Sequence, residues 1–440
     1  MAKSGELIQS IPEFGADQSI KIAPNSSVPV TPRLLRLIDS QTFQRLRKIR
    51  QLSLADQVFP SATHTRFSHA LGVYNNILAY LKHLDRFPEF HEVFQAEDYL
   101  AIMLAGLLHD VGHYPYSHQL DHLSRFPKHE KLTVALIQGE TRFEHENLGQ
   151  LIWELFRIEP AAVARLLGHQ KDLPPRLSLL KQIIDSPIDA DKCDYLPRDS
   201  YYCGVDYGTG FDRERFIHNL VPSRGRLCIH EKGLLSAERF QLARYWMYRS
   251  VYWGHTVRAL ITMLSRACAY LAEEDLGKTW EQQLMSFNDH NFLDWIHGQV
   301  DPRGKELIEM VHQRRQPYKR LYTVSYLHQP QNYLKLQQEE GRRRILDWFH
   351  QWLAKRGAGA ADHHLIWDVP PFYKTGNWES FPIKLAMGGD VPIANESPVI
   401  NALSEAFLHG VRKIRLFIHP KYAELLRRNQ AELPRIEELI

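Results

Sequence analysis

Four side chains have the types and spacing expected of a metal centre: His69, the adjacent pair His109 and Asp110, and Asp191. Each lies beside an apolar stretch, where an unpaired carboxylate would be costly to bury. A shared cation would explain all four together. Two imidazoles and two carboxylates form a mixed nitrogen and oxygen set that suits one divalent Mn, Fe or Zn ion and leaves positions for water and phosphate. The alternative is four unrelated polar residues, each with its own hydrogen bonds.

Further histidines follow closely, and the chain has 23 of them in 440 residues. A phosphoester with a poor leaving oxygen needs an acid, and an imidazolium suits that role near neutral pH. His113 follows His109 by four residues and would share its side of a continuing helix, although Gly112 interrupts the pattern. For His122 and His129 we prefer a structural hydrogen bond.

The elements that must position these residues are predicted to be mainly α-helical. Apolar residues recur at helical spacing from Thr31 to Leu52, and His109 and Asp110 end a buried helix over 98–110. Further helices are predicted over 148–155, 177–184 and 239–271. No strand is expected before about residue 220, and 226–230 is predicted to be a short strand or hairpin.

The pattern changes after about residue 275. Helices continue, for example over 342–355, and a Gly-Ala linker follows at 357–361. Strands are then predicted over 365–369, 381–385 and 413–418, with a helix over 398–410. The sequence therefore predicts an irregular N-terminal arm (1–30), a helical core (31–275), a helical extension (276–356) and a small C-terminal α+β lobe (357–440).

Composition excludes several classes of protein. Hydrophobic residues make up 44% and charged residues 24%, which is typical of a globular chain and not of a disordered one. The net charge of +3 does not indicate a nucleic-acid partner. The longest apolar run, Tyr99–Leu108, is far shorter than the roughly 20 residues of a membrane span. No secretory signal is seen, and four scattered Cys without a C-x-x-C pair favour reduced thiols and a cytoplasmic location.

Longer strings around these residues carry a family resemblance. They are Ile38–Ser40, Phe43–Leu52, Val58–Val73, Ala105–His118, Phe143–Glu146 and Ile188–Asp199. In this order, over about residues 18–260, the chain resembles the HD-domain phosphohydrolases. Within them it is most similar to the SAM-and-HD-domain deoxynucleoside triphosphate triphosphohydrolases and their bacterial relatives. No SAM domain precedes the matched region here.

The resemblance implies roles for individual residues. His69, His109, Asp110 and Asp191 would bind the catalytic metal. Around the scissile phosphate it places His113, His118, Asp121 and His145. Arg66 would contact the phosphate chain, although an Arg paired with a carboxylate is the alternative. The residues on the nucleotide would be Lys192 and Tyr195 at phosphate and sugar, Asp199 at the sugar 3′-hydroxyl, and Gln51, Leu52 and Tyr252 beside the deoxyribose.

The resemblance also implies an activator site for a guanine nucleotide at Asp39, Gln44 and Arg47, on one predicted helix. The alternative is a solvated helix face with an Asp–Arg pair. Such an activator would promote a homo-oligomer, a dimer or tetramer. Relatives often carry His-Lys where Gly254-His255 stand here, and a His replaces a phosphate-binding Lys only partly at neutral pH. This departure bears on nucleotide-driven assembly more than on catalysis.

The function implied is a metal-dependent dNTP triphosphohydrolase, activated by GTP or dGTP, with Mg accompanying the nucleotide. Water would attack the α-phosphorus, and deoxynucleoside and triphosphate would leave. Two other functions stay open. One is an HD phosphohydrolase of another ester, such as a nucleotide monophosphate, a cyclic nucleotide or a single-stranded nucleic acid. The other is a nucleotide-responsive regulatory protein. No membrane partner is expected.

Overall fold

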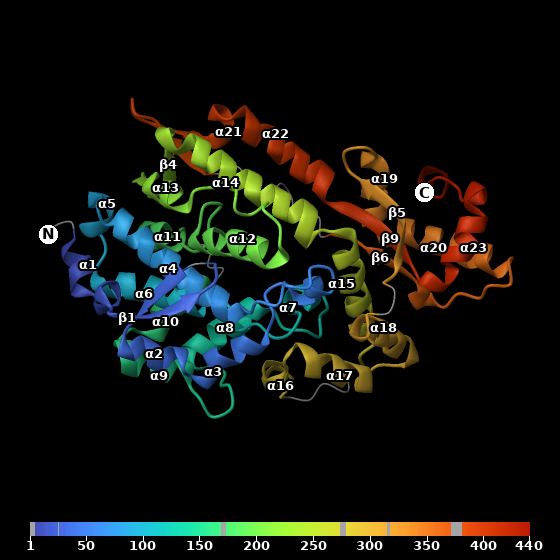
Figure 1. The fold of residues 1–440 in the computed structure, drawn as a ribbon, viewed down its shortest axis with the longest axis horizontal. Helices are drawn as coiled ribbons and strands as arrows, with labels where there is room; N and C mark the ends of the chain where they lie inside the picture. Colours follow the sequence, from blue (N-terminus) through green and yellow to red (C-terminus); the bar gives the residue numbers. More distant parts are fainter. Residues whose placement is uncertain (1–4, 25, 169–172, 273–278, 315–316, 371–380) are drawn as a thin grey trace. The chain divides into compact units, whose positions relative to one another are not determined.

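The computed structural model describes residues 5–24, 26–168, 173–272, 279–314, 317–370 and 381–440. Their contacts form two compact units, interleaved along the sequence. The first comprises Met1–Met247, Leu276–Phe292 and Asn377–Asn401, and the second comprises Tyr248–Asp275, Leu293–Gly376 and Ala402–Ile440. The predicted mainly α fold with smaller α+β parts is confirmed (Figure 1).

The first unit is built around α4 (Arg66–Leu84), which packs against α6 (Ala96–Leu108) and α12 (Ala190–Cys203). Helix α4 is buried along most of its length, so it forms the centre of this core. A capping box of Gln95 and Asp98 begins α6, which ends directly before His109. The other helices wholly within this unit are α1 (Glu6–Ser10), α2 (Pro32–Ile38), α3 (Gln41–Gln44), α5 (Pro88–His91), α7 (Ser117–Leu120), α8 (His129–Gln138), α9 (Leu148–Phe156), α10 (Pro160–Leu167), α11 (Pro175–Lys181), α13 (Arg213–His218), α14 (Leu234–Met247), α16 (Trp280–Ser286) and α21 (Ile393–Glu396).

The N-terminal segment differs from the predicted irregular arm. Strands β1 (Gln18–Ile22) and β2 (Ser26–Val30) form an antiparallel hairpin, and Val28 and Val30 are buried. Only two buried valines alternate in β2, with Pro29 between them, so the period-2 pattern is too short to recognise. Because the hairpin has only two strands, Pro29 sits on an edge strand, where its missing N–H is tolerated.

The first unit also holds a four-stranded sheet in the order β3-β4-β7-β8. Its strands are β3 (Leu220–Ser223), β4 (Arg226–His230), β7 (Pro382–Lys384) and β8 (Asp390–Pro392). The strands predicted near 226–230 and 381–385 are therefore confirmed. They pair with each other in parallel, so two regions far apart in the sequence share one sheet.

The second unit contains an antiparallel sheet in the order β5-β9-β6, formed by β5 (Lys319–Ser325), β9 (Lys413–Ile418) and β6 (Leu365–Asp368). Strand β5 falls where only helices were predicted. The helix predicted over 239–271 is interrupted by a π-helical turn, Tyr248–Tyr252. The other helices are α15 (His255–Cys268), α18 (Pro302–His312), α19 (Pro330–Gln337), α20 (Glu339–Ala354) and α23 (Ala423–Arg428), together with α17 (Asp289–Gln299) and α22 (Pro398–Ala406), which contribute residues to both units.

None of the described helices combines the length and the apolar character that crossing a bilayer requires. The four cysteines, all within described segments, are buried and free, as the sequence predicted for reduced thiols.

A buried carboxylate at the start of α17 gives a pH-dependent prediction for stability. Burial raises the pKa of Asp289 to about 6, although its Oδ2 accepts the Arg50 backbone N–H at 2.8 Å. The folded state therefore holds this proton more tightly than the unfolded state, and the associated stability is lost as pH rises from about 4, the usual pKa of an Asp, through 6. A shift of about two pKa units corresponds to about 3 kcal/mol.

We therefore expect Asp289→Asn to gain thermal stability relative to wild type, by a few degrees, as the pH rises from 4 to 7. Thermal unfolding of both proteins across this range measures the difference. Asp301→Asn, at a partly exposed helix N-cap, serves as the control and should show no such trend. A constant difference between Asp289→Asn and wild type at all pH values would show that Asp289 does not titrate in this range.

Candidate metal centre and catalytic site

The four predicted metal ligands lie together in the first unit. His69 lies on α4, His109 and Asp110 follow the end of α6, and Asp191 lies in the first turn of α12. Asp191 Oδ1 is 3.0 Å from His69 Nε2 and 3.8 Å from His109 Nε2. Asp110 Oδ1 is 3.3 Å from His109 Nε2, and its Oδ2 is 3.9 Å from His69 Nε2. Packing of α4 against α6 and α12 thus brings together ligands from distant parts of the chain.

The protonation of the two imidazoles shows that this set fits a metal. His109 Nδ1 donates to the Gly106 carbonyl at 2.8 Å, and a carbonyl can only accept. His69 Nδ1 donates to Asp194 Oδ2 at 2.8 Å. In the neutral rings both Nε2 atoms therefore present lone pairs, and these face carboxylate oxygens. Such an arrangement calls for positive charge between them, a proton or a metal ion, and an outward Nδ1–H bond is the usual feature of a metal-bound histidine.

The pKa shifts have the same cause. Burial alone lowers the pKa of His69, but bonds to Asp191 and Asp194 more than offset this and raise it to about 10. Burial likewise disfavours ionised Asp110, yet the neighbouring His109 and Arg66 hold its pKa well below the usual range. Asp194, held by Arg198, has a pKa of about 2 in spite of its burial. A bound metal would displace the proton that otherwise occupies this anionic centre.

Asp194, paired with Arg198, holds the His69 ring at Nδ1, on the side away from the other ligands. Arg198 donates from Nε and Nη2 to the two Asp194 oxygens, both at 2.8 Å, and both side chains are buried. Gly72 permits this approach, because a Cβ there would lie 1.8 Å from Asp194 Oδ1. The sequence prediction did not include this pair, although their i, i+4 spacing on the helix that carries Asp191 is a usable signal.

Asp194→Asn is expected to weaken metal binding by about 10- to 100-fold, because the amide cannot hold the His69 Nδ1–H as strongly. Titration with Mn²⁺ of the metal-free protein measures this. Asp98→Asn, which breaks an ion pair with Arg176 at the surface, is the matched control and should bind metal as wild type does. Wild-type affinity in Asp194→Asn would exclude the supporting role.

Three further histidines pack against one another beside the metal ligands. The ring centroids of His113 and His129 are 3.8 Å apart, those of His118 and His129 4.5 Å, and those of His113 and His118 4.7 Å. His113 Nε2 lies 3.0 Å from Asp110 Oδ1, so this ring packs directly beside that ligand. Burial and the charge of nearby side chains keep the pKa of His113 well below normal, whereas His118 is exposed to solvent.

His129 forms an oriented pair with Asp121, whose Oδ2 lies 3.0 Å from His129 Nδ1. The carboxylate fixes the proton on Nδ1, so Nε2 is the atom that can exchange a proton with a ligand. His129 thus makes a hydrogen bond of the kind that the sequence analysis preferred, and it also belongs to the histidine cluster.

His145, in contrast, is exposed, and the cluster of described histidines contains His129 instead. Its neighbour Glu146 has a structural role. Its carboxylate accepts the backbone N–H groups of Gln41 at 3.1 Å and Thr42 at 2.8 Å, at the start of α3. The signal for His129 is its position at the start of an amphipathic helix, eight residues after an acid.

The predicted phosphate-binding residues make carboxylate contacts. Arg66 Nη1 donates to Asp110 Oδ2 at 2.6 Å, which is the alternative stated for this residue. Lys192 Nζ donates to Asp189 Oδ2 at 2.6 Å. Tyr195 lies one turn after Asp191 on α12. Their contacts with phosphate and sugar stay predictions.

Two of the residues predicted to contact the sugar, Asp199 and Gln51, are linked through His64. Asp199 Oδ1 is 2.8 Å from Nε2 of buried His64, and the His64 carbonyl accepts the Gln51 backbone N–H at 3.0 Å. Leu52 follows Gln51 and is half-buried. Tyr252 belongs to the second unit, where its ring packs against Tyr248.

The predicted activator residues do not share one helix, so that prediction was wrong. Helix α2 ends at Ile38, and Ser40 Oγ caps α3 by accepting the Phe43 N–H, so Asp39 lies at the junction. Gln44 and Arg47 are joined by a 2.7 Å bond from Arg47 Nε to Gln44 Oε1. Arg47 is exposed, and nucleotide binding at these residues stays a prediction.

The second unit holds another cluster, Glu306, His363 and His364, joined by His419. Here backbone N–H groups of Ala361 and Lys421 donate to Nδ1 of His364 at 2.9 Å and of His419 at 3.0 Å. His419 Nε2 then carries the proton and lies 3.3 Å from Glu306 Oε1, whereas His364 Nε2 accepts from Lys421 Nζ at 3.0 Å. Protein donors thus already occupy the lone pairs of these ring nitrogens, and no metal is assigned to this cluster.

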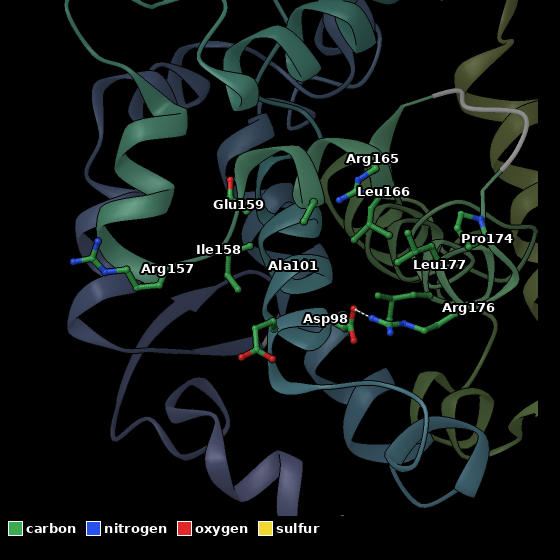
Figure 2. Close-up of a pocket in the computed structure, with 13 residues that line it drawn as sticks. Asp98, Ala101, Arg157, Ile158, Glu159, Arg165, Leu166, Pro174, Arg176 and Leu177 are labelled. Atoms are coloured by element: carbon green, nitrogen blue, oxygen red, sulfur yellow. Dashed lines mark hydrogen bonds and ion pairs between the residues drawn. The ribbon is translucent and has the colours of Figure 1, made fainter.

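A cavity of about 460 Å³ lies among α6, α10 and α11 (Figure 2). Apolar side chains such as Ala101, Leu166 and Leu177 line it, and Asp98 forms an ion pair with Arg176 at its edge. Neither the metal ligands nor the clustered histidines line it, so it is separate from the candidate catalytic site.

Comparison with known proteins agrees with this geometry. The sequence matches the HD domain over residues 66–198, which includes all four candidate ligands, and the HD associated region over residues 211–438. It is 35% identical to the uncharacterized protein YwfO of Bacillus subtilis over 52% of this chain and 50% of that protein. It is 27% identical to human deoxynucleoside triphosphate triphosphohydrolase SAMHD1 over 71% of this chain and 55% of that protein.

The chain spans 50–61% of the length of the first curated relatives that it matches. Among solved structures, a hypothetical protein from Aquifex aeolicus is 27% identical, with a TM-score of 0.72, and the match covers 94% of this chain and 99% of that one. A phosphohydrolase from Bacteroides thetaiotaomicron, 23% identical with a TM-score of 0.70, shares the fold over 91% of this chain and 99% of its own.

Proposed function

Because the chain belongs to the HD-domain family and carries its HD associated region, we propose that it is a metal-dependent dNTP triphosphohydrolase. It would convert a dNTP and water into a deoxynucleoside and triphosphate. The observation that carries this proposal is the convergence of two imidazole lone pairs, on His69 and His109, with the carboxylates of Asp110 and Asp191. The similarity to SAMHD1 supports the substrate class.

These four residues would hold one Mn, Fe or Zn ion, which polarises a phosphate and lowers the pKa of water. The other side chains bind, orient and move protons. Asp110 is kept ionised and in place by Arg66, with the His113 ring beside it. Asp121 orients His129, whose Nε2 would protonate the 5′-oxygen as it leaves the α-phosphorus. His118, beside that ring, would contact the phosphate chain.

In this proposal Gln51, Leu52 and Tyr252 discriminate against ribonucleotides. Asp199 accepts a hydrogen bond from the sugar 3′-hydroxyl. An added 2′-hydroxyl would meet the apolar Leu52 side chain without a hydrogen-bond partner, which disfavours it. Asp199 is already fixed by His64, so an oriented acceptor is in place for a sugar hydroxyl.

Regulation is assigned to the linked pair Gln44 and Arg47, together with Asp39. GTP or dGTP, with its Mg ion, would bind there and promote a homo-oligomer, a dimer or tetramer. The support is the forked guanidinium of Arg47, which is exposed and held in place by Gln44.

The test uses protein loaded with Mn²⁺, each of the four dNTPs and their ribonucleotide counterparts, with and without GTP. Detection of inorganic triphosphate separates this function from hydrolysis of a monophosphate, a cyclic nucleotide or a nucleic acid, which share the same metal site. We expect kcat/KM for dGTP to exceed that for GTP by about tenfold or more. Equal values would remove the sugar-side assignment.

A further inference from the structure

A buried arginine lies between the predicted nucleotide residues and the catalytic site. Arg45 begins the 3-10 turn η2 (Arg45–Lys48) and is 7% exposed. Its Nη1 donates to the His113 carbonyl at 2.7 Å, and its Nη2 donates to the Val111 carbonyl. No carboxylate of the described residues forms an ion pair with it, and burial lowers its pKa to about 9. A buried charge satisfied by two carbonyls is costly, so its position calls for a functional reason.

The two carbonyls belong to the turn that carries the catalytic groups. Residues 111–113 directly follow Asp110, and the His113 ring reaches back to Asp110 Oδ1 at 3.0 Å. The turn also packs on the start of α8, because a Cβ on Gly112 would lie 2.4 Å from the His129 carbonyl. Arg45 thus fixes the backbone that sets the positions of His113 and Asp110 and that lies against His129.

The other side of the same segment faces outward. Gln44 and Arg47 flank Arg45, and the Arg47 guanidinium lies 3.6 Å over the Phe67 ring. Phe67 is the neighbour of Arg66, which bonds to Asp110. Residues 41–48 therefore contact the catalytic turn on one side and present the predicted nucleotide-binding side chains on the other.

We propose that Arg45 is a positioning residue that couples a purine nucleoside triphosphate held by Gln44 and Arg47 to the turn of Asp110 and His113. The nucleotide fixes the conformation of residues 41–48. Arg45, which belongs to this segment, then holds the two carbonyls in one position. This proposal deepens the regulation in the proposed function and rests on it. Coupling of this kind is reciprocal, so metal bound at Asp110 must also strengthen nucleotide binding.

The experiment compares wild type with Arg45→Lys, which keeps the charge but cannot bridge two carbonyls with a planar fork. Steady-state kinetics with dGTP are measured with and without GTP, alongside metal content and thermal unfolding. We expect kcat to fall about 10- to 100-fold with metal content retained, and stimulation by GTP to disappear. Arg33→Lys is the control, since Arg33 is paired with Glu13, and it should keep kcat and the GTP response.

A second readout needs no turnover, so it separates this inference from the proposed reaction. The affinity of GTP is measured by calorimetry with and without Mn²⁺. Mn²⁺ should tighten GTP binding in wild type and Arg33→Lys, and not in Arg45→Lys. Absence of this effect in wild type, or its retention in Arg45→Lys, would overturn the coupling. Loss of metal and of thermal stability in Arg45→Lys in proportion to activity would also overturn it in favour of a structural role. A wild type without triphosphate release but with this linkage would contradict only the proposed reaction.

Discussion

His109→Ala is expected to abolish stable metal binding and to lower kcat on the order of a thousandfold, since a bound ion contributes several kcal/mol to such a reaction. The removed imidazole leaves two carboxylates facing a single histidine, which weakens the centre further. Metal analysis of the purified protein and the rate of triphosphate release measure the two effects. Asp191→Ala should behave in the same way, because its Oδ1 lies near both imidazoles.

His91→Ala is the matched control for that experiment. His91 is half-buried on α5 and bonds to the Asp85 carbonyl, so its loss affects stability without reaching the metal ligands. Full metal occupancy and full activity in His109→Ala would show that the assignment of the centre is wrong.

The second large effect is expected for His129. His129→Ala should lower kcat by about 10²- to 10⁴-fold while metal content stays at the wild-type level, because the metal ligands are intact and only proton transfer is lost. Asp121→Asn should lower kcat less, since the imidazole remains and only its orientation is weakened. The pH dependence of kcat in both variants reports whether the alkaline limb, on which a general acid loses its proton, has been lost.

His145→Ala provides the contrast, because the sequence string favours His145 and the packed rings favour His129. We expect His145→Ala to keep kcat within about twofold, as is usual for an exposed side chain away from the chemistry. The opposite result, with His145→Ala inactive and His129→Ala active, would contradict the assignment from geometry.

The metal-binding residues could be predicted from the sequence because each of them lies in a string with strong local constraints. His69 is followed by Gly72, which the close approach of Asp194 requires, and His109 ends a helix with a clear apolar pattern. The helical core was predictable for the same reason, since α4, α6 and α12 bury whole faces.

Other features depend on contacts that no local pattern contains. The pairing of β4 with β7 joins residues about 150 apart, and β5 alternates too weakly in burial to identify a strand. The break at Ser40 depends on a side-chain cap, with Glu146 added from a distant turn. The choice between His129 and His145 depends on ring packing, which sequence spacing does not encode.

Comparison of the two histidine clusters shows why ligand type alone is an incomplete guide. In the first unit, His69 and His109 donate from Nδ1 to acceptors, which leaves Nε2 free to bind a cation. In the second unit, His364 and His419 accept backbone N–H groups at Nδ1, and His364 Nε2 also accepts from Lys421 Nζ, so protein donors already occupy these lone pairs. We therefore expect one transition metal ion per chain, bound in the first unit.

The central claim is hydrolysis at the α-phosphorus of a dNTP by this centre. The most direct measurement is incubation of Mn²⁺-loaded protein with each dNTP in ¹⁸O-labelled water, with the products separated and weighed by mass spectrometry. The account predicts unlabelled deoxynucleoside and triphosphate carrying one ¹⁸O, because water bonds to the α-phosphorus and the 5′-oxygen leaves with a proton. Pyrophosphate with a deoxynucleoside monophosphate, phosphate with a diphosphate, or ¹⁸O in the deoxynucleoside would contradict it.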